Sequence, residues 1–219
     1  MQPQRCHWCN PRNPLYTAYH DTEWGVPLHD DARLFEILLL ETFQAGLSWE
    51  CVLNKREAFR RAFSGFDARA IARYGERETA ALLADKGIIR NRLKIAAAVT
   101  NAKVFLDIQR AHGSFDRYIW GFTGGRTLRE TGRVSSPLSD MVSKDLRRRG
   151  MKFAGTVTVY SLLQAIGVID SHEPGCFLHR EGGGDAPNAD SHGFGAVTRP
   201  ETGKSRKRSV SKTGKKVTK

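Results

Sequence analysis

The most apolar stretch of the chain, residues 34–53, carries Glu41 in line with its aliphatic residues. Counted from Leu34, the residues Ile37, Leu38 and Glu41 lie at offsets 3, 4 and 7, so a helix would put all four on one face. A buried carboxylate without a partner is costly, because burial removes its water. Glu41 is therefore paired with an Arg or Lys, turned outward, or part of a binding site, and the pattern alone leaves these possibilities open.

Aromatic residues flank this carboxylate in the sequence. Tyr16, Tyr19 and Trp24 precede it, and Phe43 and Trp49 follow it. Flat side chains beside a carboxylate suit a pocket that stacks on a nucleobase and accepts hydrogen bonds from its amino group. Ordinary core packing is the alternative, and it fits Phe43 better than the Tyr and Trp residues, which carry a polar atom.

Apolar residues at three- and four-residue spacing predict an all-α fold around these side chains. Several expected helices end at a glycine, which is typical of helix C-termini. Residues 156–160 could also form a strand, but no other strand-like segment is available to pair with them, and residues 1–30 show no sustained periodicity. The expected helices are 34–53 with a break near Gly46, 56–63, 68–74, 78–85, 90–113, 139–150 and 156–167.

The chain is basic, with 219 residues and a formal net charge of +12. This excess indicates a polyanionic partner, nucleic acid before an anionic membrane. Residues 181–219 hold nine Lys or Arg against four acids, which leaves about +7 on residues 1–180. The segment 181–219 is also too poor in large apolar residues to form a core, so we expect a folded domain of residues 1–180 and a disordered basic tail.

The N-terminal residues lack the apolar segment of a secretory signal, and no run reaches the roughly 18 apolar residues that span a bilayer. The four cysteines are too sparse for a disulfide framework in a chain of this length. We therefore expect a cytoplasmic protein without a membrane partner.

Four sequence blocks carry a resemblance to a known family. They are YTAYHDTEWGVP at 16–27, QAGLSW at 44–49, GIIRNRLKI from Gly87 and KFAGTVTVYSLLQAIG from Lys152. In this order they resemble the 3-methyladenine DNA glycosylase I family of bacteria, within the helix-hairpin-helix glycosylase superfamily, over about residues 6–176. The resemblance implies the helix-hairpin-helix glycosylase fold. It also implies a monomeric enzyme that hydrolyses the N-glycosidic bond of 3-methyladenine in alkylated double-stranded DNA.

The resemblance assigns roles in base recognition to residues already singled out by pattern. It makes Glu41 the carboxylate that recognises the everted base, with Tyr16 and Trp49 stacking on that base. Tyr19 would lie beside them, and Trp8 is a weaker candidate. The pattern and the resemblance thus name the same pocket.

The resemblance also implies a structural Zn²⁺ site formed by Cys6, His20, His172 and Cys176. Two thiolates and two imidazoles fill a tetrahedral shell and leave no position for an activated water, so the ion would tie the N- and C-terminal regions together. Spacing alone leaves other ligand sets open, because Cys6 and Cys9 form a zinc-like pair and His7 and His179 lie close by in the sequence.

DNA contacts are expected at two further segments. Gly87 and Ile88 begin a segment that resembles the superfamily's phosphate-binding hairpin, although Ile89 stands where a second glycine is common. Backbone amides at a helix start bind phosphate whatever the side chain. Arg90 and Lys94 would add positive charge, although solvated helix positions are the ordinary role of such residues.

Eversion of a nucleotide leaves a gap in the duplex, which glycosylases usually fill with an inserted side chain, the wedge. The QAGLSW block is expected to supply this wedge. Gly46 and Leu47 would fill that gap, unless Leu47 is a core residue. Asn91 stands four residues after Gly87, where lyases of the superfamily carry a lysine, so we expect no lyase activity.

Two other function classes explain part of this pattern. A zinc-stabilised DNA-binding protein without catalysis explains the charge, the Cys/His residues and the hairpin, but not a carboxylate on an apolar face beside stacking aromatics. A zinc hydrolase or nucleobase deaminase needs an open metal site, and the chain has no HxE…PCxxC arrangement.

Overall fold

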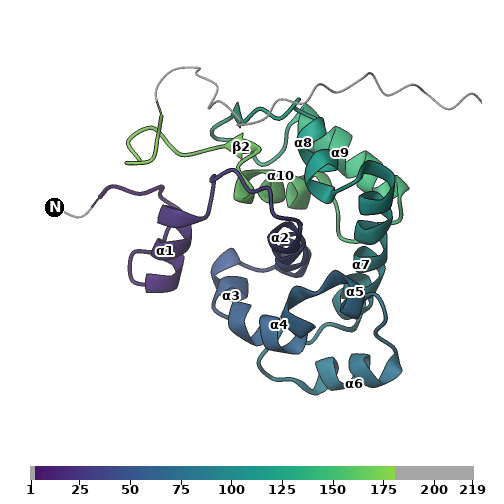
Figure 1. The fold of residues 1–219 in the computed structure, drawn as a ribbon. Coiled ribbons are helices and arrows are strands. Elements are labelled where there is room, and N and C mark those ends of the chain that lie inside the picture. The colour runs from purple at the N-terminus through teal and green to yellow at the C-terminus, as the bar shows by residue number, and fades with distance from the viewer. Residues whose placement is uncertain (1–2, 181–219) are drawn as a thin grey trace, which may run out of the picture. The chain divides into compact units, whose positions relative to one another are not determined.

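A central helix, α2 (Asp31–Gln44), organises the core. The Asp30 side chain caps its first turn by accepting a hydrogen bond from the amide of Arg33. Every residue from Leu34 to Phe43 is buried, because α2 packs against α10, α7, α8 and α3. Figure 1 shows α2 in the middle of the fold, between α10 and the α3–α4 pair.

The computed structural model describes residues 3–180. The expected tail, residues 181–219, lies outside the described residues. The other elements are α1 (Pro14–Thr22), α3 (Trp49–Leu53), α4 (Arg56–Ala62), η1 (Ser64–Phe66), α5 (Ala68–Ile71), α6 (Glu76–Ala84), α7 (Arg92–His112), α8 (Phe115–Gly121), β1 (Leu128–Arg129), α9 (Pro137–Arg148), α10 (Thr156–Ala165) and β2 (Ile169–Asp170).

The fold was expected to be all-α, and the described residues are mostly helical with one short β-ladder; residues 156–160 belong to a helix. The predicted break near Gly46 is also confirmed, since α2 ends at Gln44 and α3 begins at Trp49. The short parallel ladder of β1 and β2, which pairs Leu128 with Ile169, was not expected. Helix α8 was not expected either. Among the described residues, no helix is long and apolar enough to cross a membrane.

Helix α1 lies within residues 1–30, where the sequence showed no sustained periodicity and no helix was expected. Pro14 occupies its first turn, and the Asn13 side chain caps it by accepting from the amides of Leu15 and Tyr16. Its buried face consists of Tyr16, Tyr19 and His20. These residues have helical spacing but are not aliphatic, so a search for aliphatic periodicity overlooked them.

Helices α6 and α7 are joined by residues 85–91, which we call the hairpin. Asn91 caps α7 by accepting from the amide of Lys94, and α7 ends before Gly113, whose φ is +86°. Ile88 is buried at the centre of the hairpin. The two helices pack against each other, so residues 85–91 form a short connection between packed helices, and their expected role as a phosphate-binding hairpin stays a prediction.

Candidate active site

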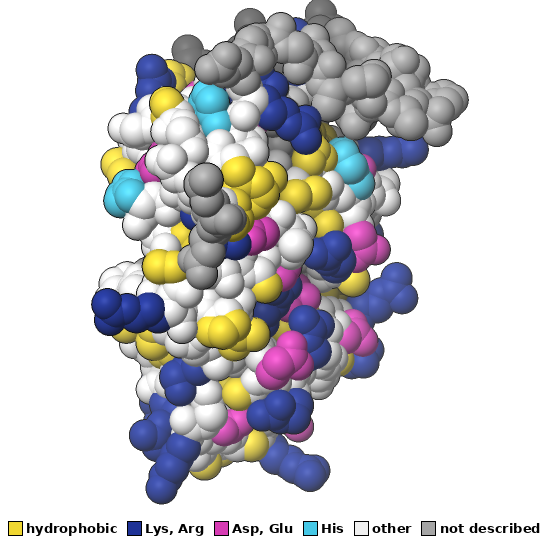
Figure 2. All heavy atoms as spheres, turned by 90° about the vertical axis from the view of Figure 1, so that its left-hand side faces the viewer, with side chains coloured by type: hydrophobic (Ala, Val, Ile, Leu, Met, Phe, Trp, Pro, Cys, Tyr) yellow, Lys and Arg dark blue, Asp and Glu magenta, His cyan; other side chains and the backbone are white. Residues whose placement is uncertain are grey.

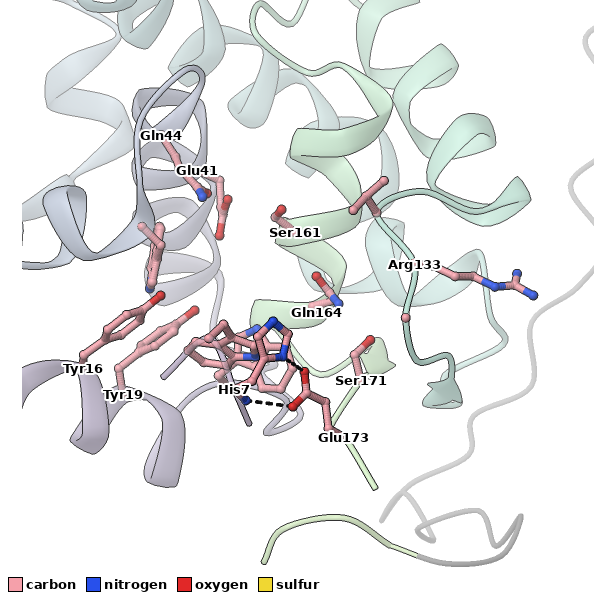
Figure 3. A pocket seen from close by; sticks show the side chains of 15 residues that line it. His7, Tyr16, Tyr19, Glu41, Gln44, Arg133, Ser161, Gln164, Ser171 and Glu173 are labelled. Carbon is pink, nitrogen blue, oxygen red and sulfur yellow. Dashed lines mark hydrogen bonds and ion pairs between the residues drawn. The ribbon is translucent and has the colours of Figure 1, made fainter. Parts of the chain in front are cut away.

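A pocket of about 360 Å³ opens between α1, α2 and α3 on one side and α10 with residues 132–134 on the other. Figure 3 shows Tyr16, Tyr19 and Glu41 on one wall, across from Ser161 and Gln164. The lining residues are His7, Trp8, Tyr16, Tyr19, Trp24, Glu41, Gln44, Trp49, Gly132, Arg133, Val134, Ser161, Gln164, Ser171 and Glu173. All five residues expected to contact the base are among them.

Glu41 lies at the inner end of this pocket. Its side chain is buried, and its Oε2 atom has no hydrogen-bond partner within the described residues. Loss of water raises the pKa of the carboxyl group to about 8. Among residues 3–180 no cation pairs with Glu41, and its side chain does not face outward, so of the possibilities left open by the sequence a binding site fits best.

A second buried acid on α2 shows what ordinary pairing looks like in this fold. Glu36 lies five residues before Glu41, and its Oε1 atom accepts from Arg56 Nε and Arg60 Nη2, each at 2.7 Å. Arg56 also contacts the carboxylate of Glu23 at 2.8 Å. The charge of Glu36 is thus balanced by two guanidinium groups, whereas the carboxyl group of Glu41 remains available to a ligand.

Aromatic rings form the wall next to Glu41. The ring centroids of Tyr19 and Trp49 are 5.2 Å apart, and those of Trp8 and Tyr16 are 5.3 Å apart. Burial raises the pKa of Tyr16 to about 12 and that of Tyr19 well above its usual value, so both hydroxyls stay protonated. Trp49 Nε1 is a buried donor without a partner in the part of the chain that the structure describes. The wall can stack on a flat ligand and donate hydrogen bonds to it.

Side-chain hydrogen bonds hold α1 and α3 together beneath this wall. Glu50 Oε1 accepts from Asn10 Nδ2 at 2.9 Å and from Asn13 Nδ2 at 2.8 Å. Ser48 caps α3 by accepting from the amide of Cys51. These local contacts fix the separation of the tyrosines on α1 from Trp49 at the start of α3.

Several polar residues that line the pocket were not predicted from the sequence, namely Gln44 beside Glu41 on α2 and Ser161, Gln164 and Ser171 on the opposite side. Gln44 lies one turn after Glu41, and its i+3 spacing could have revealed it. Ser161 and Gln164 share the same spacing on α10, but no feature of these common residue types distinguishes them in the sequence. Ser171 contributes a buried hydroxyl oxygen with no partner among residues 3–180.

The turn at residues 45–48, here called the wedge turn, lies at the start of α3. Gly46 has a φ of +77°, which favours glycine. The side chain of Leu47 is 41 % exposed, which excludes the alternative that Leu47 is a core residue. Its exposure fits the expected role at the DNA surface.

The hairpin offers free backbone donors. The amide of Gly87 donates to Asp85 Oδ1 at 2.7 Å, whereas the amides of Ile88, Ile89 and Arg90 have no acceptor among the described residues. The Arg90 side chain is exposed. Lys and Arg side chains project at the lower border of the face in Figure 2, the end where α4 and α6 lie in Figure 1.

Lys94 does not lie where a DNA contact was expected. Its side chain is buried, and its Nζ atom donates to the carbonyl oxygens of Phe43 and Ala45. The helix periodicity of α7 places this position inward, and the end of α2 supplies carbonyl acceptors there. The assumption of a solvated surface cation is therefore corrected.

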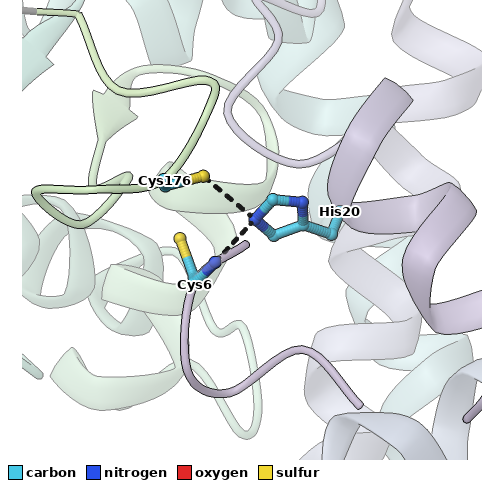
Figure 4. A group of neighbouring side chains, drawn as sticks. All are labelled: Cys6, His20 and Cys176. Carbon is cyan, nitrogen blue, oxygen red and sulfur yellow. Dashed lines mark hydrogen bonds between the residues drawn. The ribbon is translucent and has the colours of Figure 1, made fainter. Parts of the chain in front are cut away.

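Three of the four expected metal ligands, Cys6, His20 and Cys176, place their ligand atoms within 4.8 Å of one another (Figure 4). His172 is outside this group, but its ring centroid lies 5.5 Å from that of His20, and its Nε2 atom is buried without a partner in the described chain. Each histidine uses Nδ1 to contact an aspartate at 2.8 Å, His20 with Asp21 and His172 with Asp170. Such contacts fix the ring and direct Nε2 toward a metal.

The competing ligand sets have other partners. His7 contacts the carboxylate of Glu173, and His179 Nδ1 contacts the carbonyl oxygen of His172 at 2.7 Å. Cys9 Sγ lies 3.8 Å from the carbonyl oxygen of Tyr16. All four cysteines are free thiols, so no disulfide competes for the cluster.

Sequence comparison finds known DNA glycosylases that are similar to this chain. The sequence model of the methyladenine glycosylase family matches residues 8–179. The DNA-3-methyladenine glycosylase 1 of Escherichia coli (strain K12) is 43% identical over 180 residues, which cover 79% of this chain and 95% of the relative. The DNA-3-methyladenine glycosylase of Haemophilus influenzae is 37% identical over 178 residues, covering 78% and 96%.

Solved structures agree in fold as well. A crystal structure of 3-methyladenine DNA glycosylase I superposes with a TM-score of 0.78 at 44% identity, covering 81% of this chain and 100% of that one. A variant of such an enzyme in complex with 3-methyladenine gives a TM-score of 0.75 at 34% identity, covering 78% and 97%. The chain, whose pocket combines a buried carboxyl group with an aromatic wall, belongs to the methyladenine glycosylase family.

Proposed function

We propose that this protein removes 3-methyladenine from alkylated double-stranded DNA by hydrolysing the bond between base and sugar, as the first step of base-excision repair. The observation that carries the proposal is Glu41, a buried carboxyl group with no partner in the described part of the chain, in a pocket walled by aromatic rings. The names of the relatives support the substrate and the reaction.

Recognition follows from the chemistry of the pocket. Methylation at N3 gives adenine in DNA a positive charge, and the ring carries an amino group at its edge. Glu41 can accept a hydrogen bond from that amino group and balance the charge, and a charge-assisted hydrogen bond is stronger than a neutral one. Tyr16 and Trp49 stack on the ring, with Tyr19 and Trp8 completing the wall.

The reaction needs little general-acid catalysis from the protein. A cationic base leaves as a neutral molecule without receiving a proton, so an acid beside the leaving group is not needed. Holding the base everted and admitting water to the sugar then suffices for hydrolysis. Asn91, whose side chain caps α7, offers no amine for a Schiff base, which supports a hydrolase without lyase activity.

DNA is engaged at the hairpin and the wedge turn. The free amides of Ile88 and Arg90, next to Gly87, bind a backbone phosphate, and the Arg90 side chain adds charge. Leu47 with Gly46 enters the duplex where the base has left it. The hairpin would thus hold the bound strand while the wedge turn fills the gap left by the base.

The cluster of Cys6, His20, His172 and Cys176 binds a structural Zn²⁺. Two imidazole nitrogens held by aspartates and two buried thiols form a donor set typical of such sites. The ion supplies a cross-link rather than a reaction step. Free thiols and the absence of disulfides support a reducing compartment, the cytoplasm, where the protein would reside with the nucleoid through its DNA contacts.

The proposal is tested with duplex DNA that has been treated with a methylating agent. We expect chromatography to show release of 3-methyladenine, and a denaturing gel to show no strand cleavage. Binding to the duplex without release of any base would instead identify a zinc-stabilised DNA-binding protein. Strand cleavage coupled to release would contradict the assignment as a hydrolase alone.

A further inference from the structure

Lys94 joins two segments that the proposed function treats separately. It lies in the first turn of α7, directly after the hairpin. Its Nζ atom is 2.7 Å from the carbonyl oxygen of Phe43 and 2.6 Å from that of Ala45. These carbonyl groups lie at the end of α2, where the last turn has no partners within the helix. The ammonium group therefore caps α2 at the residues that lead into the wedge turn.

A second lysine makes the reciprocal contact. Lys55, between α3 and α4, donates from Nζ to the carbonyl oxygen of Gly87 at 3.2 Å. Lys94, which follows the hairpin, thus donates to the carbonyl groups at the end of α2 and the start of the wedge turn. Lys55, which follows α3, donates to a carbonyl group of the hairpin. Together the two contacts bridge the segments in both directions, although they lie about 40 residues apart in the sequence.

The charge of Lys94 is costly at this position. Burial lowers its pKa, because a protonated amine loses water in the interior. No carboxylate within the described residues forms an ion pair with it. An apolar side chain of similar length would fill the same space without this cost, but it could not hold two carbonyl groups at once. The contact is therefore better explained by the geometry that it imposes than by packing alone.

We propose that Lys94 is a positioning residue that couples the phosphate-binding hairpin to the wedge turn. When the hairpin holds the DNA backbone, the Lys94 contact fixes where Leu47 stands relative to that backbone. The same contact holds the end of α2, two residues after Glu41. Lys55 supports the arrangement from the opposite side. This inference rests on the proposed function, and it adds a residue that contacts neither DNA nor base.

The test compares Lys94→Met with the parent protein, and uses Lys103→Met as the matched control because Lys103 is an exposed lysine on the same helix. The first readout is a duplex with an abasic-site analogue next to 2-aminopurine, whose fluorescence rises when a wedge unstacks it. The second is kcat for release of 3-methyladenine from methylated duplex, and the third is the Kd for free 3-methyladenine. Thermal melting confirms that each variant is folded at the assay temperature.

For Lys94→Met we expect a smaller fluorescence rise at saturating protein and a kcat lowered by about tenfold or more, because small misplacements of a positioned group are expensive. The Kd for the free base should stay within about twofold of the parent, since the pocket wall does not include Lys94. The Lys103→Met control should match the parent in all three readouts. Lys55→Met should shift fluorescence and kcat in the same direction as Lys94→Met, to a smaller extent.

The inference is overturned if folded Lys94→Met keeps the parental fluorescence and kcat. It is also overturned if the fold decrease in kcat is no larger than the fold increase in the Kd for free 3-methyladenine. If Lys94→Met does not fold, Lys55→Met decides, and unchanged fluorescence would then reject the coupling. A parent protein that releases no 3-methyladenine would contradict the proposed function instead. The fluorescence comparison would still decide whether Lys94 positions the wedge turn.

Discussion

At the scale of single residues, binding of the base depends on the protonation state of Glu41. In the empty pocket desolvation holds its pKa at about 8, so at neutral pH the carboxyl group is mostly protonated. A cationic base in contact with it favours the ionised form. Binding of the base should therefore displace a proton from Glu41.

This coupling predicts a pH dependence of kcat/KM. Because the ionised fraction of Glu41 grows as pH rises toward 8, kcat/KM for methylated DNA should increase by up to about tenfold per pH unit below 8 and level off above it. Glu41→Gln cannot ionise, so its lower kcat/KM should lack this rise. Rates measured between pH 6 and 9 test the prediction, and a parental profile with the same shape as that of Glu41→Gln would contradict it.

The same residue predicts how stability depends on pH. The pKa of Glu41 is higher in the folded protein than in the unfolded chain, so its favourable contribution is complete below the unfolded pKa and is lost as pH rises through about 8. At pH 7 the loss amounts to about 4 kcal/mol for a pKa of about 8 against about 4.3 in the unfolded chain.

Denaturant unfolding of the parent and Glu41→Gln tests this sign. The free energy of unfolding of Glu41→Gln should exceed that of the parent increasingly from pH 5 to pH 8, with the smallest difference at the acid end. A difference that is constant with pH would mean that Glu41 already has a partner in solution.

At the scale of elements, the connection from α2 to α3 combines two tasks. The end of α2 presents Glu41 to the pocket, and the wedge turn presents Leu47 to solvent. Leu47→Ala should lower the rate of 3-methyladenine release from duplex DNA by about tenfold, since the gap left by the everted base is then unfilled. Release from methylated single-stranded DNA should change little, and such a difference between duplex and single strand distinguishes a wedge from a pocket residue.

The stability of Leu47→Ala serves as its control. Because the side chain is 41 % exposed, its truncation should shift Tm by only a few degrees. A large fall in Tm would show that Leu47 packs in the core in solution, and an equal loss of activity on both DNA forms would also contradict its role as a wedge.

The sequence made the aliphatic helices predictable, because their residues repeat at three- and four-residue spacing. This periodicity predicted helix α2, which was expected to break near Gly46. Glu41 was conspicuous because a charged residue occupies an aliphatic position of the repeat. Helix α1 was missed since its buried face carries tyrosines and a histidine. The partner of Lys94 depends on the meeting of α2 with α7, and such long-range contacts are not encoded in local periodicity. Ser161 and Gln164 reach the pocket for the same tertiary reason.

At the scale of the whole described chain, the proposed zinc site joins segments that are far apart in the sequence. Cys6 precedes α1, whereas His172 and Cys176 follow β2. Trp8 and Glu173, which are neighbours of these residues, line the pocket. Metal binding at this position would thus close one side of the base-binding site as well as stabilise the fold.

This connection predicts one Zn²⁺ per chain by elemental analysis of protein purified without chelator. Removal of the ion, or Cys176→Ser, should lower Tm by several degrees, because a metal that binds only the folded state stabilises it. Cys51→Ser is the control, since Cys51 lies outside the cluster. Metal content below one tenth of the protein concentration, with a Tm insensitive to strong chelators, would be incompatible with a structural zinc.

The central claim concerns the single acid that faces the everted base, and single-turnover kinetics test it most directly. Release of 3-methyladenine from methylated duplex is measured at pH 8 for the parent, Glu41→Gln and Glu57→Gln, in which Glu57 is an exposed glutamate on α4. We predict that the Glu41→Gln rate falls on the order of 10²-fold, as for loss of a charge-assisted contact in a desolvated site, while Glu57→Gln matches the parent. A Glu41→Gln rate equal to the parental rate would contradict the account.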